Sequence, residues 1–574
     1  MAVIIDAHTI VPNFNVHIKV SAGPGAGKTK WLINHLINVL NHSDRLLITR
    51  KIACITYTNV ATDTILKRLG DSAHQVEIST IHSFLYKHVL KPYANFLEAE
   101  FGLNAKRLKG HDDKVLTNYS FIKEWKLRTK QQRIKDDDKV KDAFRKIRWE
   151  FNPSGELEAK LPYPIKVGSF SILNSSMMEY KKMAWEKGIV HHDDVLFLSY
   201  QLIEKFPFVL RVLRSKFPYF FLDEFQDISP IQMHILKQIA LDETTVCIVG
   251  DNAQSIYGFT GAVAGQFSAF TLPGMVEYEI TDNWRSTNKI VTLLNQIRTD
   301  LTQVDMRSVP GTAPVIILGD KMSAWRFAGG DCGSADLCTL AYLNTTANAV
   351  RKGLTTSFTK DLISELYKTD SNPERPGTIV RCVKAIEYAS QGYFKDALKE
   401  TAKIAAIDDE DKSKRQSLVI LKTLLDGQSH FSSGKLIDLY AFVKSSGIKS
   451  LAGFSGANPK TFYETQNVQD FSAAVRALDE SLPFRTIHKS KGDEFDAVLV
   501  IIHDDVPGSY EEIKELEFLF APDLSKEDHR VRYVALSRAK NHLYINLPSL
   551  THSSESTLRG MGFRIVYSGV AEYS

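Results

Sequence analysis

The stretch FPYFFLDEFQD at residues 217–227 decides the fold. Its first half is a short apolar and aromatic run, which is typical of a strand buried on both faces of a parallel sheet. Asp223 and Glu224 follow at the end of that strand, where open α/β sheets bind their ligands. Adjacent side chains on a strand point to opposite faces, so one acid can face a metal ion and the other a water molecule. Taken alone, the stretch is better explained by an acidic loop after a buried strand, so the interpretation depends on the rest of the chain.

A phosphate-binding loop is indicated upstream by AGPGAGKT at residues 22–29. It follows an alternating strand predicted at 16–20 and precedes an apolar helix predicted at 31–40, which is the context that a P-loop requires. Lys28 would reach the β- and γ-phosphates, and Thr29 would hold Mg²⁺. Backbone N–H groups could approach the phosphates because the loop residues are small, namely Ala22, Gly23, Gly25, Ala26 and Gly27. The alternative is a tight turn that caps a helix.

Length and composition bound the class of protein. The chain has 574 residues, which predicts about three to five domains. Its formal charge of +4 confines any nucleic-acid surface to a local patch. The five cysteines lack metal-ligand spacing, and a disulfide framework is implausible in so long a chain. We find no signal peptide and no apolar run long enough to span a membrane, and we expect a cytoplasmic protein.

A basic segment lies between the first motifs and the acidic strand. Residues 101–150 contain 15 Lys and Arg against 8 Asp and Glu, together with Trp125 and Trp149. Basic residues mixed with aromatic ones suit a surface that follows phosphates, and a solvated helical face is the equally weighted alternative. The cluster His191-His192-Asp193-Asp194 is better explained by the start of a helix predicted at 195–206 than by a metal site.

Other short apolar runs also end in polar residues, at 52–59, 79–84, 246–261 and 282–287. Read singly, the first two are ordinary strand-to-loop junctions. A polar side chain directly after a core strand, such as Gln254, can sense a bound phosphate. Exposed aromatic residues in a loop bracketed by glycines can stack on bases.

Taken in order, these segments resemble the motifs of superfamily 1 DNA helicases of the UvrD/Rep/PcrA type. The matching blocks are AGPGAGKT (22–29), TYTN (56–59), TIHS (80–83), DEFQD (223–227), GDNAQSIYGF (250–259), NWRST (283–287), TIHKSKGDEF (486–495) and YVALSRA (533–539). They span nearly the whole chain in the family's order.

The resemblance implies an ATP site that uses Mg²⁺. It assigns the phosphate-loop roles to Lys28 and Thr29, the Mg²⁺-binding acid to Asp223 and the water-activating acid to Glu224. It further implies a set of residues that contact the nucleotide: Gln254, Arg285 and Arg538 at the γ-phosphate, Trp284 stacked on adenine and Glu494 on the ribose. Arg538 would act as an arginine finger supplied in cis.

For DNA, the resemblance implies movement 3′ to 5′ along a single strand. Tyr57 and Phe259 match aromatic residues that stack on bases, and His82 and His488 match positions near the DNA backbone. Thr58, Asn59 and Tyr257 lie in the same blocks and are expected to contact DNA. Single-stranded or 3′-tailed DNA is therefore the expected partner, beside an unidentified protein partner and without a membrane.

Three features depart from the family pattern. The usual adenine-reading glutamine upstream of the loop is missing, since the first glutamine is Gln75. Asn13 or Asn15 is a candidate substitute. Phe259 replaces the usual tryptophan and Trp284 the usual tyrosine. The second insertion is short, as in small helicases of antiphage systems such as Gabija.

The predicted fold class is α/β, with two RecA-like P-loop NTPase domains built on parallel sheets. Each domain carries a mainly helical insertion. The predicted boundaries are 1–85 with 191–272 for the first motor domain, 86–190 for the basic helical insertion, 273–358 with 481–574 for the second motor domain, and 359–480 for the reduced insertion.

The expected function is an ATP-dependent 3′-5′ DNA helicase or translocase. One alternative is a DNA-stimulated ATPase subunit that does not unwind robustly by itself. Another is a nucleotide-gated sensor within a multi-protein complex, for example in antiphage defence.

Overall fold

The computed structural model describes residues 2–57, 59–108, 118–167, 169–258, 261–354, 361–405, 407, 409–475, 482–503 and 510–568. They form two compact units that divide after Asp282. Each unit contains its own parallel sheet, so the predicted α/β class with two parallel-sheet domains is confirmed.

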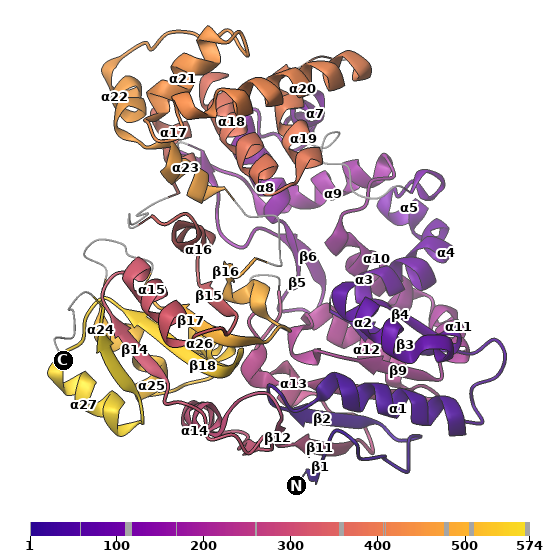
Figure 1. Cartoon of the computed structure of the whole chain (residues 1–574). Coiled ribbons are helices and arrows are strands. Elements are labelled where there is room, and N and C mark those ends of the chain that lie inside the picture. Colours follow the sequence, from indigo (N-terminus) through magenta and orange to yellow (C-terminus); the bar gives the residue numbers. More distant parts are fainter. Residues whose placement is uncertain are drawn as a thin grey trace. The chain divides into compact units, whose positions relative to one another are not determined.

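The first unit is built on a sheet whose described strands lie in the order β1-β11-β2-β10-β9-β3-β4, all parallel (Figure 1). Their bounds are β1 (Val3–Ile5), β2 (Ile18–Ala22), β3 (Ile52–Thr56), β4 (Val76–Thr80), β9 (Tyr219–Leu222), β10 (Thr245–Gly250) and β11 (Val276–Ile280). The strand before the phosphate loop thus begins two residues later than predicted, because pairing with β10 and β11 starts at Ile18.

Helices cover both faces of this sheet, which explains why its strands are apolar throughout. Cys54, Phe221 and Cys247 pack in one cluster with α1 and α2, whereas Phe220 and Leu222 pack in another with α10, α11 and α12. The helices are α1 (Lys28–His42), α2 (Asn59–Leu69), α3 (Ile81–Leu85), α10 (His192–Lys205), α11 (Pro207–Lys216), α12 (Pro230–Ala240) and α13 (Gln266–Ala269).

The boundary of the first unit differs from the predicted one. Val276–Ile280 forms β11, which lies between β1 and β2, and the unit extends to Asp282 rather than to 272. The segment VEYEI alternates apolar and acidic residues, which is the period of a strand.

The insertion of the first unit combines helices with two antiparallel hairpins. Its described elements are α4 (Lys91–Tyr93), α5 (Glu98–Phe101), α7 (Tyr119–Arg128), α8 (Asp137–Lys146), α9 (Met177–Glu186), β5 (Arg148–Phe151), β6 (Leu157–Lys160), β7 (Lys166–Val167) and β8 (Phe170–Ser171). It shares one apolar core with α10 and α12, so it is anchored on a face of the motor sheet.

A buried polar cluster forms part of that anchor. Asp194, in the first turn of α10, accepts hydrogen bonds from the indole N–H groups of Trp149 at 2.9 Å and Trp185 at 3.1 Å. The Lys181 ammonium lies 2.6 Å from the same carboxylate. His191 and Asp194 also form a capping box, so this cluster does begin a helix, which starts at His192 rather than at the predicted 195.

The second unit has a parallel sheet with the described strands in the order β16-β15-β17-β18-β14-β19. Its strands are β14 (Val315–Leu318), β15 (Leu337–Ala341), β16 (Phe484–Thr486), β17 (Phe495–Ile501), β18 (Ala539–Leu547) and β19 (Arg564–Tyr567), and β12 (Asp282–Asn283) pairs separately with β13 (Val304–Asp305). Its helices are α14 (Asn288–Ile297), α15 (Lys321–Asp331), α16 (Asn344–Arg351), α24 (Glu512–Glu515), α25 (Glu517–Phe520), α26 (Glu527–Leu536) and α27 (His552–Gly560).

The insertion of the second unit is mainly helical in its described residues, with an isolated β-bridge between Lys435 and Asn467, and has its own apolar core. It comprises α17 (Leu362–Thr369), α18 (Arg375–Ser390), α19 (Phe394–Ala405), α20 (Glu410–Asp426), α21 (Leu436–Ser445), α22 (Ala457–Thr465) and α23 (Val468–Ala474). None of the helices in the described ranges has the length and hydropathy needed to span a bilayer.

Candidate functional site

The phosphate loop joins the carboxyl end of β2 to the amino end of α1. Gly25 and Gly27 have φ angles of 74° and 80°, in the left-handed region that glycine tolerates. A Cβ atom on Gly27 would also lie 2.9 Å from the Cβ of Ala7. No side chain in the described part of the chain caps α1, so its first backbone N–H groups are available to an anion. The Lys28 ammonium donates to the Ala22 carbonyl oxygen at 3.4 Å, at the start of the same loop.

Two acids lie beside this loop, at the end of β9. The Thr29 hydroxyl donates to Asp223 Oδ2 at 3.3 Å, and the backbone N–H of Glu224 donates to Asp223 Oδ1 at 2.9 Å. Burial and the neighbouring Glu224 carboxylate raise the pKa of Asp223 to about 7, against the opposing effect of the Lys28 ammonium. Glu224 has a φ of 53°, a left-handed conformation that is uncommon for non-glycine residues and clusters at functional sites.

The chemistry of these donors fits Mg²⁺. The Thr29 hydroxyl and the Asp223 carboxylate are hard oxygen donors, and Mg²⁺ sites use one or two carboxylates completed by water and substrate phosphates. A cation beside Asp223 would favour the ionised carboxylate, which burial disfavours. With two protein oxygen donors, the remaining ligand positions of Mg²⁺ would be filled by water and phosphate oxygens.

A chain of hydrogen bonds runs from Glu224 to the next strand. The Gln226 side-chain amide donates to Glu224 Oε2, and Gln226 Oε1 accepts from the backbone N–H of Asp251 at 2.9 Å. Asp251 Oδ2 in turn accepts from the side-chain amide of Gln254 at 2.6 Å. Gln226, Asp251 and Gln254 are all buried. Gln254, predicted as a phosphate sensor, is thus linked to the water-activating candidate through two side chains.

In the second unit, Arg285 and Glu494 form an ion pair across 209 residues of sequence. Arg285 Nε donates to Glu494 Oε2 at 2.9 Å, and the Lys540 ammonium lies 3.2 Å from Glu494 Oε1. Burial alone would raise the pKa of Glu494, but Arg285 and Lys540 outweigh it and hold that pKa below its usual value. Trp284, the predicted adenine-stacking residue, is 53% exposed.

Arg538 lies in the same region of the second unit but is only 1% exposed. Its guanidinium donates to the carbonyl oxygens of Val534 at 3.0 Å and Asp493 at 3.2 Å. Arg285 donates to the carbonyl oxygen of Ser537, the residue before Arg538, at 2.9 Å. Three predicted nucleotide-contacting residues, Arg285, Glu494 and Arg538, are therefore brought together by the fold.

The predicted DNA-contacting aromatic residues include a stacked pair. The Tyr57 and Tyr257 rings lie 4.9 Å apart at an interplanar angle of 16°. Thr58 and Phe259 lie outside the described residues. Asn59 opens α2.

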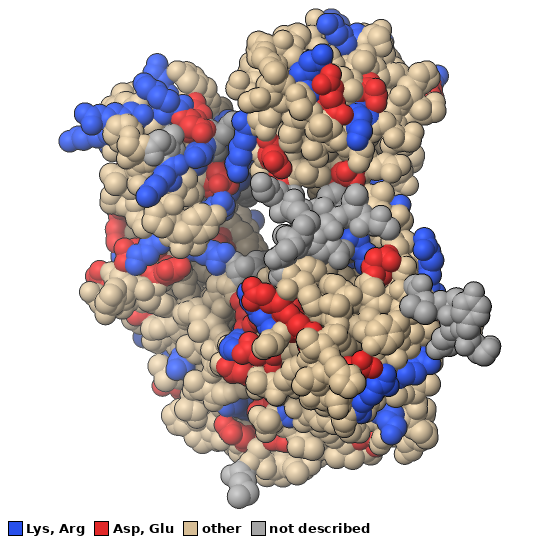
Figure 2. Space-filling model, turned by 90° about the vertical axis from the view of Figure 1, so that its left-hand side faces the viewer, with Lys and Arg blue, Asp and Glu red and all other residues tan. Residues whose placement is uncertain are grey.

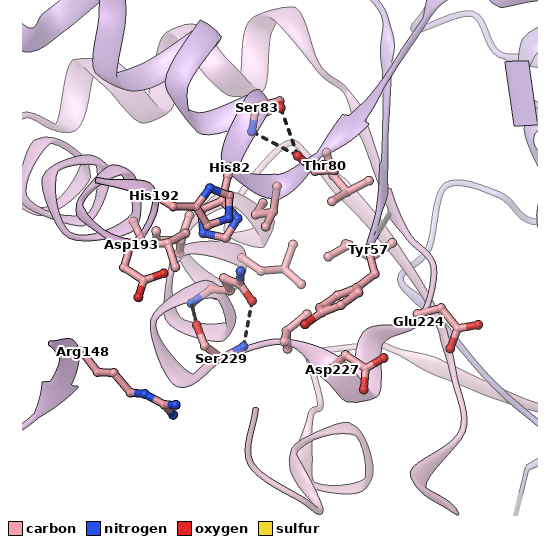
Figure 3. Close-up of a pocket in the computed structure, with 18 of the residues that line it drawn as sticks. Tyr57, Thr80, His82, Ser83, Arg148, His192, Asp193, Glu224, Asp227 and Ser229 are labelled. Atoms are coloured by element: carbon pink, nitrogen blue, oxygen red, sulfur yellow. Dashed lines mark hydrogen bonds between the residues drawn. The ribbon is translucent and has the colours of Figure 1, made fainter. Parts of the chain in front are cut away.

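The two predicted DNA-contacting histidines belong to different units. His488, in the second unit, packs edge-on against Tyr342 at 5.7 Å. In the first unit, the rings of His82 and His192 stack at 3.6 Å, as Figure 3 shows. Burial, with the neighbouring His192, lowers the pKa of His82 to about 3, so this imidazole is neutral at physiological pH.

A cavity of about 900 Å³ lies beside the His82–His192 pair (Figure 3). It is lined by residues from β3, β4, α10 and the β9 acids on the motor side, and by insertion residues that include Arg145, Arg148 and Tyr163. One wall therefore carries basic residues, while the opposite end reaches Asp223 and Glu224. A polyanion could lie against the basic wall within reach of Tyr57 and of the residues at 80–83, which also line the cavity.

The prediction that Trp125 and Trp149 contribute to an exposed aromatic surface is wrong. Both are buried in the core that joins the insertion to α10, since Trp149 stacks on Phe197 at 3.6 Å and Trp125 donates to the Ser176 carbonyl oxygen. Their large apolar area explains this placement.

Other residues supply exposed aromatic rings on this insertion. Tyr163 and Phe170 are 52% and 43% exposed. Lys146 lies over the Tyr163 ring at 5.1 Å and Arg133 over the Phe170 ring at 5.9 Å. Lys and Arg side chains gather on the upper-left lobe in Figure 2. The exposed ones on the insertion include Lys123, Arg133, Lys135, Lys139 and Arg145.

Asn15, one of the two candidate substitutes for the missing adenine-reading glutamine, lies away from the phosphate loop. Asn15 accepts a hydrogen bond from the Tyr219 hydroxyl at 2.6 Å, at the amino end of β9 and hence at the edge opposite the phosphate loop. Asn13 accepts from the backbone N–H of Asn15. The residues beside the loop are Ala7, which meets Gly27, and His8, which lies 3.0 Å from the Lys30 ammonium.

Three residues that line the cavity beside His82 are not predicted from the sequence: His192, Arg148 and Tyr163. The sequence indicates only a helix start near His192, and the contact of this residue with His82 depends on the fold.

Comparisons with known proteins agree with this geometry. Residues 6–272 match the UvrD/REP helicase N-terminal domain, and residues 354–549 match the UvrD-like helicase C-terminal domain. "Putative ATP-dependent DNA helicase YjcD" of Bacillus subtilis is 24% identical over 92% of this chain and 76% of its own length. DNA helicase II of Rickettsia typhi is 27% identical and ATP-dependent DNA helicase PcrA of Staphylococcus aureus 24% identical, each over 48% of this chain. These two matches span 41% and 37% of the relatives' own lengths.

Proposed function

The chain belongs to the UvrD/Rep family of ATP-hydrolysing DNA helicases, and from this premise we propose that it is an ATP-dependent 3′-5′ helicase or translocase on single-stranded DNA. The observation that carries the proposal is the contact between Thr29 and Asp223 beside an uncapped helix α1, with Glu224 next in the chain. This arrangement brings a phosphate cradle, oxygen donors for Mg²⁺ and a carboxylate base together from two distant parts of the sequence.

In the proposed mechanism, the backbone N–H groups at the start of α1 and the Lys28 ammonium bind the ATP phosphates. Thr29 and Asp223 would hold Mg²⁺, which would neutralise charge that develops on the β- and γ-phosphate oxygens. Glu224 accepts a proton from the attacking water. Its left-handed backbone sets where that carboxylate lies, and the hydrogen bond from Gln226 links it to the Asp251 backbone.

We assign Gln254, Arg285 and Arg538 to the γ-phosphate, Trp284 to adenine and Glu494 to the ribose. Two observations support this assignment. Arg285 donates to Glu494 and to the Ser537 carbonyl oxygen, and Arg538 donates to the Asp493 carbonyl oxygen, so the three residues lie close together. The Trp284 ring is exposed. In this conformation Arg538 donates to backbone carbonyls, so it must exchange those partners to reach a phosphate.

For DNA, we propose that one strand follows the basic wall of the cavity and the stacked Tyr57–Tyr257 pair. His82 would then meet the strand as a neutral hydrogen-bonding group. Thr58, Asn59, Phe259 and His488 are assigned by their motifs to the same strand. The exposed Lys and Arg side chains on the insertion support this path, because Lys and Arg bind DNA phosphates whatever the base sequence.

A strand-separation assay tests the proposal. Duplexes with a 3′ tail, a 5′ tail or blunt ends are incubated with ATP and Mg²⁺, and ATP hydrolysis is measured on the same substrates. We expect both activities on the 3′-tailed duplex only. DNA-stimulated hydrolysis without strand separation would favour the role of an ATPase subunit in a larger complex. Absence of hydrolysis with every DNA would overturn the enzymatic proposal.

A further inference from the structure

Two segments of the second unit that carry the proposed sensor arginines are joined by hydrogen bonds. The Ser286 hydroxyl donates to the Ala539 carbonyl oxygen at 2.7 Å, and the Thr287 N–H donates to the Lys540 carbonyl oxygen at 2.9 Å. The loop that presents Arg285 therefore lies directly against the segment that follows Arg538. Their relative position determines how the two guanidinium groups are spaced.

Arg307 bridges these segments from a third one. Its guanidinium donates to the Arg285 carbonyl oxygen at 2.6 Å, to the Lys540 carbonyl oxygen at 3.2 Å and to Asn541 Oδ1 at 3.0 Å. A planar guanidinium with five N–H donors can reach three acceptors at once, which a lysine ammonium cannot do with the same geometry. One side chain thus fixes both segments at the backbone.

The backbone around Arg307 is itself held in place. Asp305 Oδ1 accepts from the N–H groups of Arg307 at 2.9 Å and Ser308 at 3.3 Å. The Met306 N–H donates to the Asn283 carbonyl oxygen at 3.0 Å, in the β12–β13 pair. Ser308 has a φ of 55°, a left-handed conformation that a serine keeps only where its surroundings impose it. This turn anchors Arg307 next to the loop that it supports.

We propose that Arg307 is a positioning residue for ATP hydrolysis, which holds Arg285 in register with the segment that carries Arg538. The inference rests on the proposed function. Arg307 contacts the backbone of Arg285 rather than the nucleotide, so it should affect the alignment of the sensor arginines more than the binding of ADP. Misplacement of a catalytic group by about 1 Å can cost ~10²-fold in rate.

The test compares Arg307→Gln, Arg307→Lys and Asn541→Ala with the wild-type chain. Asn541→Ala removes one acceptor and leaves the arginine in place. Arg564→Gln is the matched control. Arg564 lies in β19 of the same unit, but its ion pair is with Asp331 of α15 and not with the segments that carry Arg285 and Arg538. The readouts are kcat and KM for single-strand-stimulated ATP hydrolysis, and affinity for ADP with and without aluminium fluoride, which mimics the transferring phosphoryl group.

We expect Arg307→Gln to lower kcat by ~10–100-fold and to weaken ADP–aluminium fluoride binding by a similar factor, with ADP binding unchanged. Arg307→Lys should recover part of the loss. Asn541→Ala should show a smaller loss, again in kcat and ADP–aluminium fluoride affinity and not in ADP affinity. Arg564→Gln should match the wild type. A wild-type kcat in Arg307→Gln, or equal losses of ADP and ADP–aluminium fluoride affinity in all three variants, would overturn the inference. A wild-type chain without ATPase activity would already have overturned the proposed function, and the inference with it.

Discussion

The side chain of Gln226 connects Glu224 to the backbone of Asp251: its amide donates to the carboxylate, and its carbonyl oxygen accepts from the N–H group. A Cβ atom on Gly250 would lie 2.7 Å from the same carbonyl oxygen, so the strand end is closely fitted around it. The Gln226 side chain therefore connects the Glu224 carboxylate to the segment that leads to Tyr257.

Replacing Gln226 should uncouple hydrolysis from DNA. In Gln226→Ala, Asp251 loses the acceptor for a buried N–H, which costs about 1–3 kcal/mol locally, while the phosphate loop and Glu224 remain. We expect near-normal ATPase activity without DNA and a reduced stimulation by single strands, measured in one steady-state assay. Gln238→Ala is the control, because the bond from Arg214 to Gln238 uses the backbone carbonyl oxygen, which the substitution keeps. Equal loss of basal and stimulated rates would indicate a purely structural role.

Glu224→Gln should separate binding from hydrolysis. The amide keeps the size of the side chain but cannot accept the proton of the attacking water, so we expect kcat to fall by ~10²–10⁴-fold. Affinity for ATP and single-stranded DNA, measured by fluorescence titration, should be retained. Glu243→Gln provides the control, since Glu243 precedes β10 at the opposite edge of the sheet. Wild-type turnover in Glu224→Gln would contradict the assigned role.

Affinity for single-stranded DNA should fall as the salt concentration rises, and the slope of this dependence should include a contribution from Arg145. Neutralised phosphates release counterions, so log K falls linearly with log salt concentration, by ~0.7 for each contact to a single strand. Arg145→Gln should reduce the slope by about one contact. Arg128→Gln is the matched control on the same insertion, because Glu124, Glu179 and Glu186 already pair with Arg128. Equal slopes for the wild type and Arg145→Gln would remove Arg145 from the DNA surface.

The buried Asp194 cluster should dominate the stability of the insertion. Asp194→Ala leaves the Lys181 ammonium buried without its carboxylate, which costs about 3–5 kcal/mol. The loss should appear as faster hydrogen exchange in α9 and α10 and a lower unfolding temperature by calorimetry. Asp142→Ala, which breaks only the exposed pair with Lys146, should cost at most ~0.5 kcal/mol. Similar losses in the two variants would argue against the cluster as the anchor.

The same cluster predicts how this stability depends on pH. Burial alone would raise the pKa of Asp194, but the Lys181 ammonium, His191 and the Trp149 hydrogen bond outweigh it and hold that pKa below its usual value. A carboxyl group whose pKa is lower in the folded state stabilises the fold at pH values above its unfolded-state pKa. This stabilisation is lost as the pH falls through the folded-state pKa. We therefore expect the protection of α9 and α10 from hydrogen exchange to be independent of Asp194 titration at neutral pH. Protection should fall only below about pH 4. A fall in protection near pH 6 would contradict this assignment.

Local spacing was enough to predict the phosphate loop and the acid pair. The residues from Ala22 to Thr29 need only a strand and a helix on either side, and both form, although the strand begins two residues later and the helix three residues earlier than predicted. Contacts between distant segments were not predictable in this way. The Arg285–Glu494 pair and the Arg307 bridge depend on where the sheet of the second unit places β17 and β18. Trp149 is buried because Asp194 and Phe197 receive its ring.

The position of β11 has a practical consequence for cutting the chain. A fragment that ends at 272 would lack the strand between β1 and β2. β2 would then present an unpaired apolar edge, which invites pairing between molecules and aggregation, and β1 would have no neighbour to hold Ala7 near Gly27. A fragment that runs to Asp282 keeps every strand of the first sheet, so it is the one suited to measuring nucleotide binding by the first unit alone.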